Sequence, residues 1–241
     1  MVAKKHRLDE SDKVISFGEH VLSFNRWLLT SRPKFPDGVE VLNPFKSTEV
    51  KRVNELFYRR FYHDTNDRYF LFGINPGRLG AGLTGIPFTD PVNLGLYAGI
   101  PNELPQKAEL SSDFIYRMIN ALGGHDEFFR TFFMTAVCPL GFVKDGINMN
   151  YYDDKALLAA AEPFILKSIK RQLDFGCRRE IAFIIGEGKN LDLFSRWNER
   201  YGFFKSLIGL PHPRFVMQYR RKQIASYIAL YQSHLQPRML E

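Results

Sequence analysis

The stretch from Tyr69 to Phe88 constrains the fold of this chain more than any other feature. It opens with an apolar run, Tyr69 to Ile74, that has the length and aromatic content of a buried strand. Asn75, Pro76 and Gly77 then break the run, and a glycine-rich loop leads to the large ring of Phe88. Glycine allows unusual backbone angles and the close approach of another molecule. A polar residue and a glycine loop at the end of a strand indicate a ligand crevice in an open α/β sheet.

This loop also has simpler interpretations. A Gly/Pro-rich connection after a strand is often only a turn. The sequence contains no G-x-x-x-x-G-K-[ST] motif for binding nucleotide phosphates. The spacing of Gly80, Gly82 and Gly85 matches a dinucleotide fingerprint, but these glycines lie at least five residues beyond the strand rather than in the turn that follows it. The loop therefore does not predict a phosphate site of either kind.

The rest of the chain alternates between helical and extended patterns. Further buried strands are predicted at residues 132–137, 181–185 and 206–210, and helices at 11–29, 48–62, 111–122, 154–175, 191–201 and 217–235. Irregular loops are predicted at 87–106 and 144–152. Continuous apolar strands separated by helices are typical of a parallel sheet covered on both faces. We predict an α/β fold, a three-layer α/β/α sandwich around a four-stranded, mainly parallel sheet. Residues 1–241 would form one domain, with residues 1–65 as N-terminal helical elements packed on it.

This fold brings distant residues together. Asn75 and His212 each follow a predicted strand, and the carboxyl ends of parallel strands open on one edge of the sheet. We therefore expect both side chains to lie in one crevice.

Charge and composition narrow the function. The net charge is +7, and the segment from Arg200 to Leu240 carries seven Lys or Arg residues and no acidic residue. Such a one-signed region attracts polyanions.

No apolar run reaches the ~20 residues of a membrane span, and the N-terminus has no signal-peptide pattern. We expect an intracellular protein, cytoplasmic if bacterial. Cys138 and Cys177 are expected to be reduced thiols, and no metal or other cofactor is expected because no His/Cys cluster has ligand spacing.

Residues 73–88 read G-I-N-P-G-R-L-G-A-G-L-T-G-I-P-F and resemble the first motif of the uracil-DNA glycosylase superfamily. The similarity is greatest to the single-strand-selective monofunctional branch, whose pattern is G-M-N-P-G-x-F-G-M-x-Q-T-G-V-P-F. The two align over 16 positions without a gap. Cys138-Pro139-Leu140 is similar to the C-P-L of that branch, and the segment Leu210 to Arg214 is similar to its catalytic H-P-S-P-R region. The resemblance covers residues 69–235.

The resemblance implies a monofunctional DNA glycosylase that hydrolyses the N-glycosidic bond of uracil or another deaminated base in DNA and so initiates base-excision repair. Asn75 would orient the attacking water and His212 would donate a hydrogen bond to the leaving base. The remaining implied site residues are Ile74, Gly77, Phe88 and Ala136 for the base, and Arg214 and Phe215 for the DNA. From the basic segment we add Arg220, Arg221 and Lys222 as DNA-binding residues. DNA would be the partner, no membrane is involved, and the enzyme would be a monomer. No lysine occupies a motif position, so lyase chemistry through a Schiff base is not expected.

The sequence departs from the branch pattern in ways that affect specificity. Ala136 stands where the branch has an asparagine that reads uracil, and a methyl group cannot make those hydrogen bonds. The histidine motif is two residues shorter, and Thr89 replaces a glycine. Other branches carry a catalytic aspartate at the position of Asn75, and the nearest spare carboxylate here is Asp90. Two alternatives stay open: a non-catalytic nucleic-acid-binding module on the same fold, and a nucleoside hydrolase.

Overall fold

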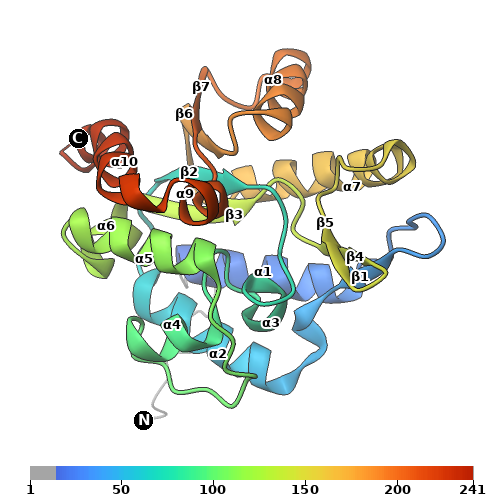
Figure 1. Cartoon of the computed structure of the whole chain (residues 1–241), viewed down its shortest axis with the longest axis horizontal. Coiled ribbons are helices and arrows are strands. Elements are labelled where there is room, and N and C mark those ends of the chain that lie inside the picture. Colours follow the sequence, from blue (N-terminus) through green and yellow to red (C-terminus); the bar gives the residue numbers. More distant parts are fainter. Residues whose placement is uncertain (1–14, 241) are drawn as a thin grey trace, which may run out of the picture.

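A computed structural model describes residues 15–240 of the chain (Figure 1). Its centre is a four-stranded sheet with the order β3-β2-β6-β7, in which every neighbouring pair is parallel. The strands are β2 (Arg68–Gly73), β3 (Phe132–Ala136), β6 (Cys177–Ile185) and β7 (Ser206–Leu210). The predicted α/β class and the four predicted strands are confirmed. Strand β6 begins earlier than predicted, because residues 177–180 are charged or only partly buried and carry no apolar signal.

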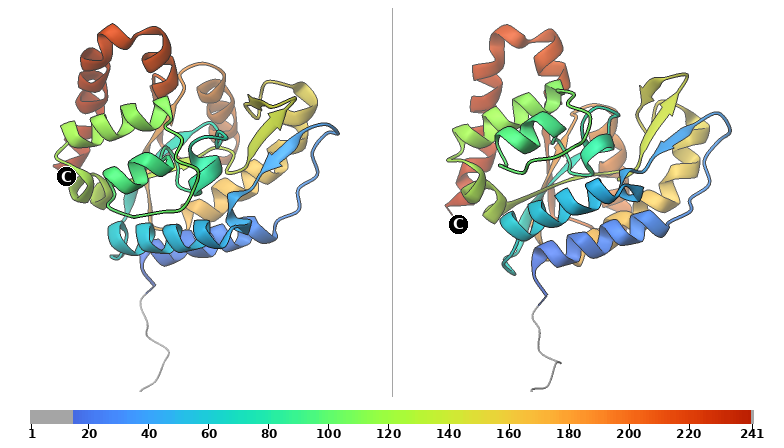
Figure 2. Two further views of the ribbon diagram at one scale, coloured as in Figure 1. Left: turned by 60° about the horizontal axis from the view of Figure 1, so that its bottom comes forward. Right: turned by 90° about the horizontal axis from the view of Figure 1, so that it is seen from below.

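Helices cover both faces of the sheet, because successive side chains of a buried strand point to opposite sides. On one face, Phe70 of β2 packs against Phe17 of α1 (Phe17–Thr30), and Phe72 packs against Phe194 of α8 (Lys189–Tyr201). Helix α7 (Lys155–Leu173) lies on this face too. On the other face lie α5 (Leu110–Ala121) and α6 (His125–Thr131), the latter packed through Phe128 on Phe132. Helix α2 (Thr48–Phe61) runs beside α1 (Figure 2). The three-layer prediction is thereby confirmed.

A second, smaller sheet was not predicted. It consists of β1 (Glu40–Leu42), β4 (Gly141–Lys144) and β5 (Ile147–Met149), all antiparallel. The prediction of a loop over residues 144–152 was therefore wrong for β5. Asp145 and Gly146 join β4 to β5 with positive φ angles of 49° and 73°. A two-residue hairpin turn of this kind requires positive φ at both positions and favours Asp-Gly, so the signal was present in the sequence.

Short helices interrupt two regions that the sequence pattern left irregular. They are η2 (Pro44–Lys46), α3 (Ala81–Thr84) and α4 (Pro91–Leu96). Helix α4 lies inside the predicted loop 87–106, which was wrong to that extent. Asp90 caps this helix by accepting a hydrogen bond from the backbone N–H of Asn93, and Pro91 stands at its first turn. Both are ordinary helix-start signals.

The predicted single helix over 217–235 was also wrong. The chain forms α9 (Pro213–Tyr219), a short turn η3 (Arg221–Gln223) and α10 (Ile224–Met239). Residues 220–223 contain no apolar side chain to bury, and Arg220 leaves the helical region with φ −128°. The hydroxyl of Tyr231 then donates to the carbonyl oxygen of Pro211 at 2.7 Å, which fixes α10 beside the start of α9. The two helices form a projecting hairpin with the basic residues at its tip (Figure 2).

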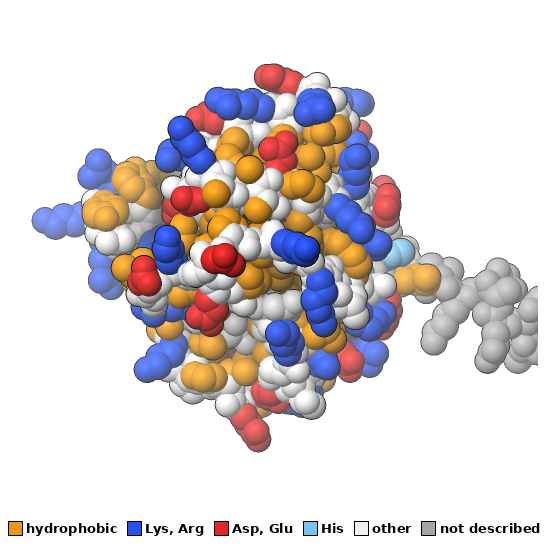
Figure 3. Space-filling model, turned by 90° about the vertical axis from the view of Figure 1, so that its right-hand side faces the viewer, with side chains coloured by type: hydrophobic (Ala, Val, Ile, Leu, Met, Phe, Trp, Pro, Cys, Tyr) orange, Lys and Arg blue, Asp and Glu red, His pale blue; other side chains and the backbone are white. Residues whose placement is uncertain are grey.

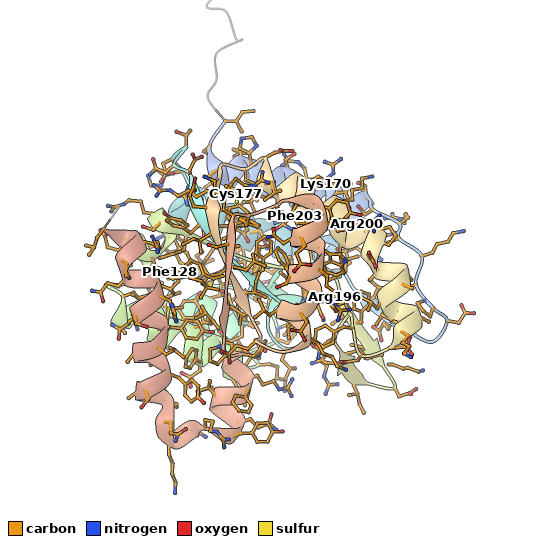
Figure 4. All side chains as sticks on the ribbon, turned by 90° about the horizontal axis from the view of Figure 1, so that it is seen from above. Phe128, Lys170, Cys177, Arg196, Arg200 and Phe203 are labelled. Atoms are coloured by element: carbon orange, nitrogen blue, oxygen red, sulfur yellow. The ribbon has the colours of Figure 1, made fainter. Side chains whose placement is uncertain are left out.

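Basic side chains elsewhere are involved in packing. Lys170 of α7 and Arg200 of α8 both lie 5.2 Å from the ring of Tyr201, and Figure 4 shows them on the side of the molecule opposite the α9–α10 hairpin. On the face seen in Figure 3, Lys and Arg side chains are interspersed with Asp and Glu. Within residues 15–240, no helix is both long enough and apolar enough to cross a bilayer.

Candidate active site

A cavity of about 400 Å³ opens at the carboxyl ends of the sheet strands. Its lining comes from the loop after β2, the end of β3, the end of β5 with the residue after it, the start of α5, and α9 with the residue before it. The sequence-predicted residues that line it are Ile74, Asn75, Gly77, Phe88, Ala136, His212, Arg214 and Phe215. The fold thus brings together residues that are far apart in sequence, because β2, β3 and β7 end on the same edge of one parallel sheet.

Asn75 lies two residues beyond the end of β2, and its side-chain amide is held at both ends. Its Nδ2 donates to the carbonyl oxygen of Met149 at 3.0 Å, and its Oδ1 accepts a hydrogen bond from the backbone N–H of Tyr151 at 3.0 Å. An amide oxygen has two lone pairs, so Oδ1 can accept one more hydrogen bond. The Asn75 amide is therefore fixed in orientation and still able to bind a water molecule in the cavity.

His212 stands between β7 and α9, where it caps the helix. The backbone N–H of Arg214 donates to Nδ1 of His212 at 3.1 Å, so the neutral ring carries its proton on Nε2. Burial lowers the pKa of His212 to about 4, and the positive charge of Arg214 acts in the same direction. At neutral pH the side chain is thus an uncharged donor at the edge of the cavity.

Phe88 closes the glycine-rich loop with a positive φ of 55°, which is uncommon for a bulky residue. Its ring lies against the backbone of Gly73, where a Cβ would come within 2.6 Å of the ring, and its centroid is 6.3 Å from the His212 ring. Thr84 supports this conformation because its hydroxyl donates to the carbonyl oxygen of Thr89 at 2.6 Å. The loop therefore presents an aromatic face to the cavity beside His212.

Ala136 is the last residue of β3 and pairs with Gly73 of β2. Its small side chain leaves room: a second, mainly apolar cavity of about 40 Å³ lies beside it and shares Pro76, Ala81, Pro87 and Thr135 with the main one. Ile74 and Gly77 complete this part of the wall. At Ala136 the cavity wall can make van der Waals contact with a bound base, but the Ala136 side chain cannot form a hydrogen bond with it.

The residues predicted to bind DNA fall into two groups. Arg214 and Phe215 line the cavity, and Phe215 is 42% exposed beside Tyr219, which is 63% exposed. Arg220, Arg221 and Lys222 do not line it and lie at the tip of the α9–α10 hairpin. The guanidinium of Arg220 lies 5.5 Å from the Phe215 ring, which links the two groups.

Several cavity residues were not singled out individually from the sequence. Glu109 and Ser111 come from the segment that starts α5, and Asn148, Met149 and Asn150 from the segment around β5. The Asp145-Gly146 pair is a hairpin signal from which β5 could have been predicted. The sequence around Glu109 contains no signal that predicts a place in the cavity. The carboxylate considered from sequence, Asp90, lies elsewhere: it is fully buried and occupied in capping α4 and holding the backbone N–H of Glu109 at 2.9 Å.

The described part of the chain contains no candidate metal site. Over the described part of the chain, no three His, Cys, Asp or Glu side chains come close enough to hold one. Cys138 is buried and Cys177 partly buried, and neither forms a disulfide.

Comparison with known proteins assigns the chain to a family. The family model for the uracil DNA glycosylase superfamily matches residues 60–236. The chain belongs to the uracil-DNA glycosylase superfamily. The crystal structure of wild-type SMUG2 from Pedobacter heparinus is similar over 93% of this chain and 98% of that one, with 41% identity and a TM-score of 0.89. A search of curated protein sequences gave no match. The family resemblance inferred from residues 73–88 is confirmed.

Proposed function

We propose that the protein is a monofunctional DNA glycosylase that hydrolyses the N-glycosidic bond of uracil or another deaminated base in DNA, and that it initiates base-excision repair. The observation that carries the proposal is the placement of the Asn75 amide oxygen and the His212 imidazole on one cavity beside the ring of Phe88. Membership of the superfamily and the similarity to SMUG2 support the general activity.

The chemistry divides between these residues. A base flipped out of the helix enters the cavity and stacks on Phe88, which offsets part of the few kcal/mol that flipping costs. Asn75 Oδ1 accepts a hydrogen bond from a water molecule and aims its oxygen at C1′. An amide is too weak a base to remove the proton outright, so its contribution is positioning. The C1′–N bond breaks and its electron pair leaves with the base. The water oxygen bonds to C1′ and gives up one proton, and the departing base anion takes up a proton, directly or through solvent.

His212 acts on the leaving base. Its Nε2–H donates to a carbonyl oxygen on which negative charge gathers as the C1′–N bond breaks. A donor aimed at developing charge contributes about 2.7–4 kcal/mol in measured enzymes. The neutral ring still carries the Nε2 proton that this hydrogen bond needs, so the low pKa of His212 is compatible with the role of a donor.

DNA is the proposed partner of the exposed residues around the cavity. Phe215, Tyr219 and the basic hairpin tip lie on the side from which a strand would enter, and Lys/Arg contacts to phosphates supply much of the affinity in such complexes. That the enzyme acts as a monomer inside the cell stays a prediction.

Single-turnover assays test this proposal. Oligonucleotides containing uracil, hypoxanthine or xanthine are incubated with excess protein, and free nucleosides are assayed alongside. We expect base release from at least one oligonucleotide, with strand breakage only after alkali. Binding without base release would instead indicate a non-catalytic module, and cleavage of nucleosides alone a nucleoside hydrolase.

A further inference from the structure

Two polar side chains that the proposed mechanism does not use face the open side of Gly77. A Cβ at Gly77 would lie 3.5 Å from Nδ2 of Asn148 and 3.9 Å from Oε1 of Glu109. Both side chains line the main cavity. Any substrate atom above Gly77 would therefore come within reach of an amide nitrogen and a carboxyl oxygen.

The orientation of Asn148 is set by the glycine-rich loop itself. The Oδ1 of Asn148 accepts a hydrogen bond from the backbone N–H of Arg78 at 3.2 Å, which turns Nδ2 toward Gly77. The Arg78 guanidinium in turn donates to the carbonyl oxygen of Gly146 at 2.7 Å, in the turn before β5. These two bonds join the hairpin to the loop, so the Asn148 donor occupies a defined place on the cavity wall.

Glu109 is also held in place. Its backbone N–H donates to the buried carboxylate of Asp90, and its carboxyl lies over Gly80, where a Cβ would collide with Oε2. The pKa of Glu109 is raised, mainly because the carboxyl is buried. A hydrogen bond with Ser111 opposes this shift. The negative charge of Asp90 adds to the shift, and the positive charge of Arg214 reduces it. A carboxyl accepts hydrogen bonds when it is ionised and can also donate one when it is protonated.

Resting on the proposed function, we propose that Glu109 and Asn148 together read the polar edge of the flipped base, the role that the missing side-chain amide at Ala136 leaves open. The chemical class they suit is a base whose carbonyl oxygen meets the Asn148 donor and whose neighbouring N–H or carbonyl meets the Glu109 carboxyl. A base that leaves buried polar groups unpaired is rejected strongly. These two residues would then set selectivity among deaminated bases, rather than the rate common to all of them.

Two nearly isosteric variants separate this role from a structural one. Glu109→Gln keeps the size of the side chain but stays uncharged and gains a fixed donor. Asn148→Asp keeps the oxygen that accepts from Arg78 and loses the donor facing Gly77. Glu103→Gln is the matched control, because Glu103 is exposed in the segment before α5 and does not line the cavity.

The measurement is the ratio of single-turnover rates on uracil-, hypoxanthine- and xanthine-containing oligonucleotides, from pH 5 to 9. We expect each variant to change at least one ratio by about tenfold or more, as the removal of polar recognition does, and the control to change none. The ratios of the parent enzyme should shift as Glu109 ionises, and those of Glu109→Gln should not. Equal losses on all bases, or unchanged ratios, would overturn the assignment. A parent protein that releases no base at all would instead refute the proposed function.

Discussion

The backbone N–H of Tyr151 donates to Oδ1 of Asn75 at 3.0 Å, although the two residues are 76 positions apart. The Asn75 Nδ2 donates to Met149 in the same segment. The end of β5 and the residues just after it thus fix the side chain that we propose orients the attacking water. Groups already held in the reactive geometry lose little entropy during the reaction, which is how positioning contributes to rate.

The first prediction concerns this amide. Asn75→Ala should reduce single-turnover excision at least a hundredfold, because no group would hold the water, while DNA affinity should change little. Asn120→Ala is a suitable control, since Asn120 is exposed on α5 outside the cavity. Near-parental excision by Asn75→Ala would show that the water is held elsewhere.

Replacing His212 tests the proposed donor. His212→Ala should lower excision by roughly 10²–10³, and His212→Gln, which keeps an N–H donor, should lose less. The uracil excision rate of the parent enzyme should show no inflection near 6.5, the ordinary imidazole value, because the ring stays neutral down to a pH of about 4. A rate that follows an inflection near pH 6.5 and loses it in His212→Gln would contradict a neutral donor.

The same pKa shift has a consequence for stability. His212 resists protonation when folded and accepts a proton below about pH 6.5 when unfolded. Its contribution to the free energy of unfolding is therefore complete above pH 6.5 and is lost as the pH falls toward 4. As the pH falls from 6.5 to 4, the free energy of unfolding of the parent should therefore decrease relative to that of His212→Gln. Urea denaturation at several pH values measures this change. A difference that stays constant from pH 7 to 4 would argue against the shift.

The basic hairpin tip is tested by salt dependence. Changing Arg220, Arg221 and Lys222 together to Gln should flatten the plot of log affinity against log salt, by about 0.9 for each phosphate that the variant no longer neutralises. The charge-matched control changes Lys170, Arg196 and Arg200, which lie on α7 and α8 (Figure 4). A slope altered equally by both triple variants would place the DNA path elsewhere.

Ala136→Asn should shift preference toward uracil. The change restores an amide at the end of β3, and the 40 Å³ cavity beside Ala136 offers space for it. Apolar fit alone separates bases by only about 10–200-fold, whereas a site that hydrogen-bonds its substrate discriminates far more strongly. The ratio of rates on uracil and xanthine oligonucleotides measures the shift. If the parent already excludes xanthine as strictly as the variant does, residue 136 does not set the preference.

Much of this molecule could be predicted from sequence, because its strands and its first motif are local signals. The runs at Tyr69 and Phe132 are continuous and apolar because both faces of these parallel strands are buried, and both matched strands in the structure. The run at Ser206 matched the edge strand β7, which is only partly buried. Asn75 and His212 each lie two residues beyond the end of a strand, so their shared edge of the sheet was predictable.

Other features depended on contacts that no local pattern encodes. The pattern from Met217 to Leu235 predicts one helix, yet the chain turns at Arg220, where the side chains are polar and have nothing to bury. The helix that follows the turn is held in place by the hydrogen bond from the Tyr231 hydroxyl to the carbonyl oxygen of Pro211. Glu109 looks like an ordinary surface carboxylate in sequence, and only the packing of its segment against Asp90 and Gly80 places it in the cavity. The sequence by itself determined the four-stranded sheet, the edge at which Asn75 and His212 lie, and the family. Tertiary structure decided which polar groups meet there, because hydrogen bonds between segments far apart in the chain orient those side chains.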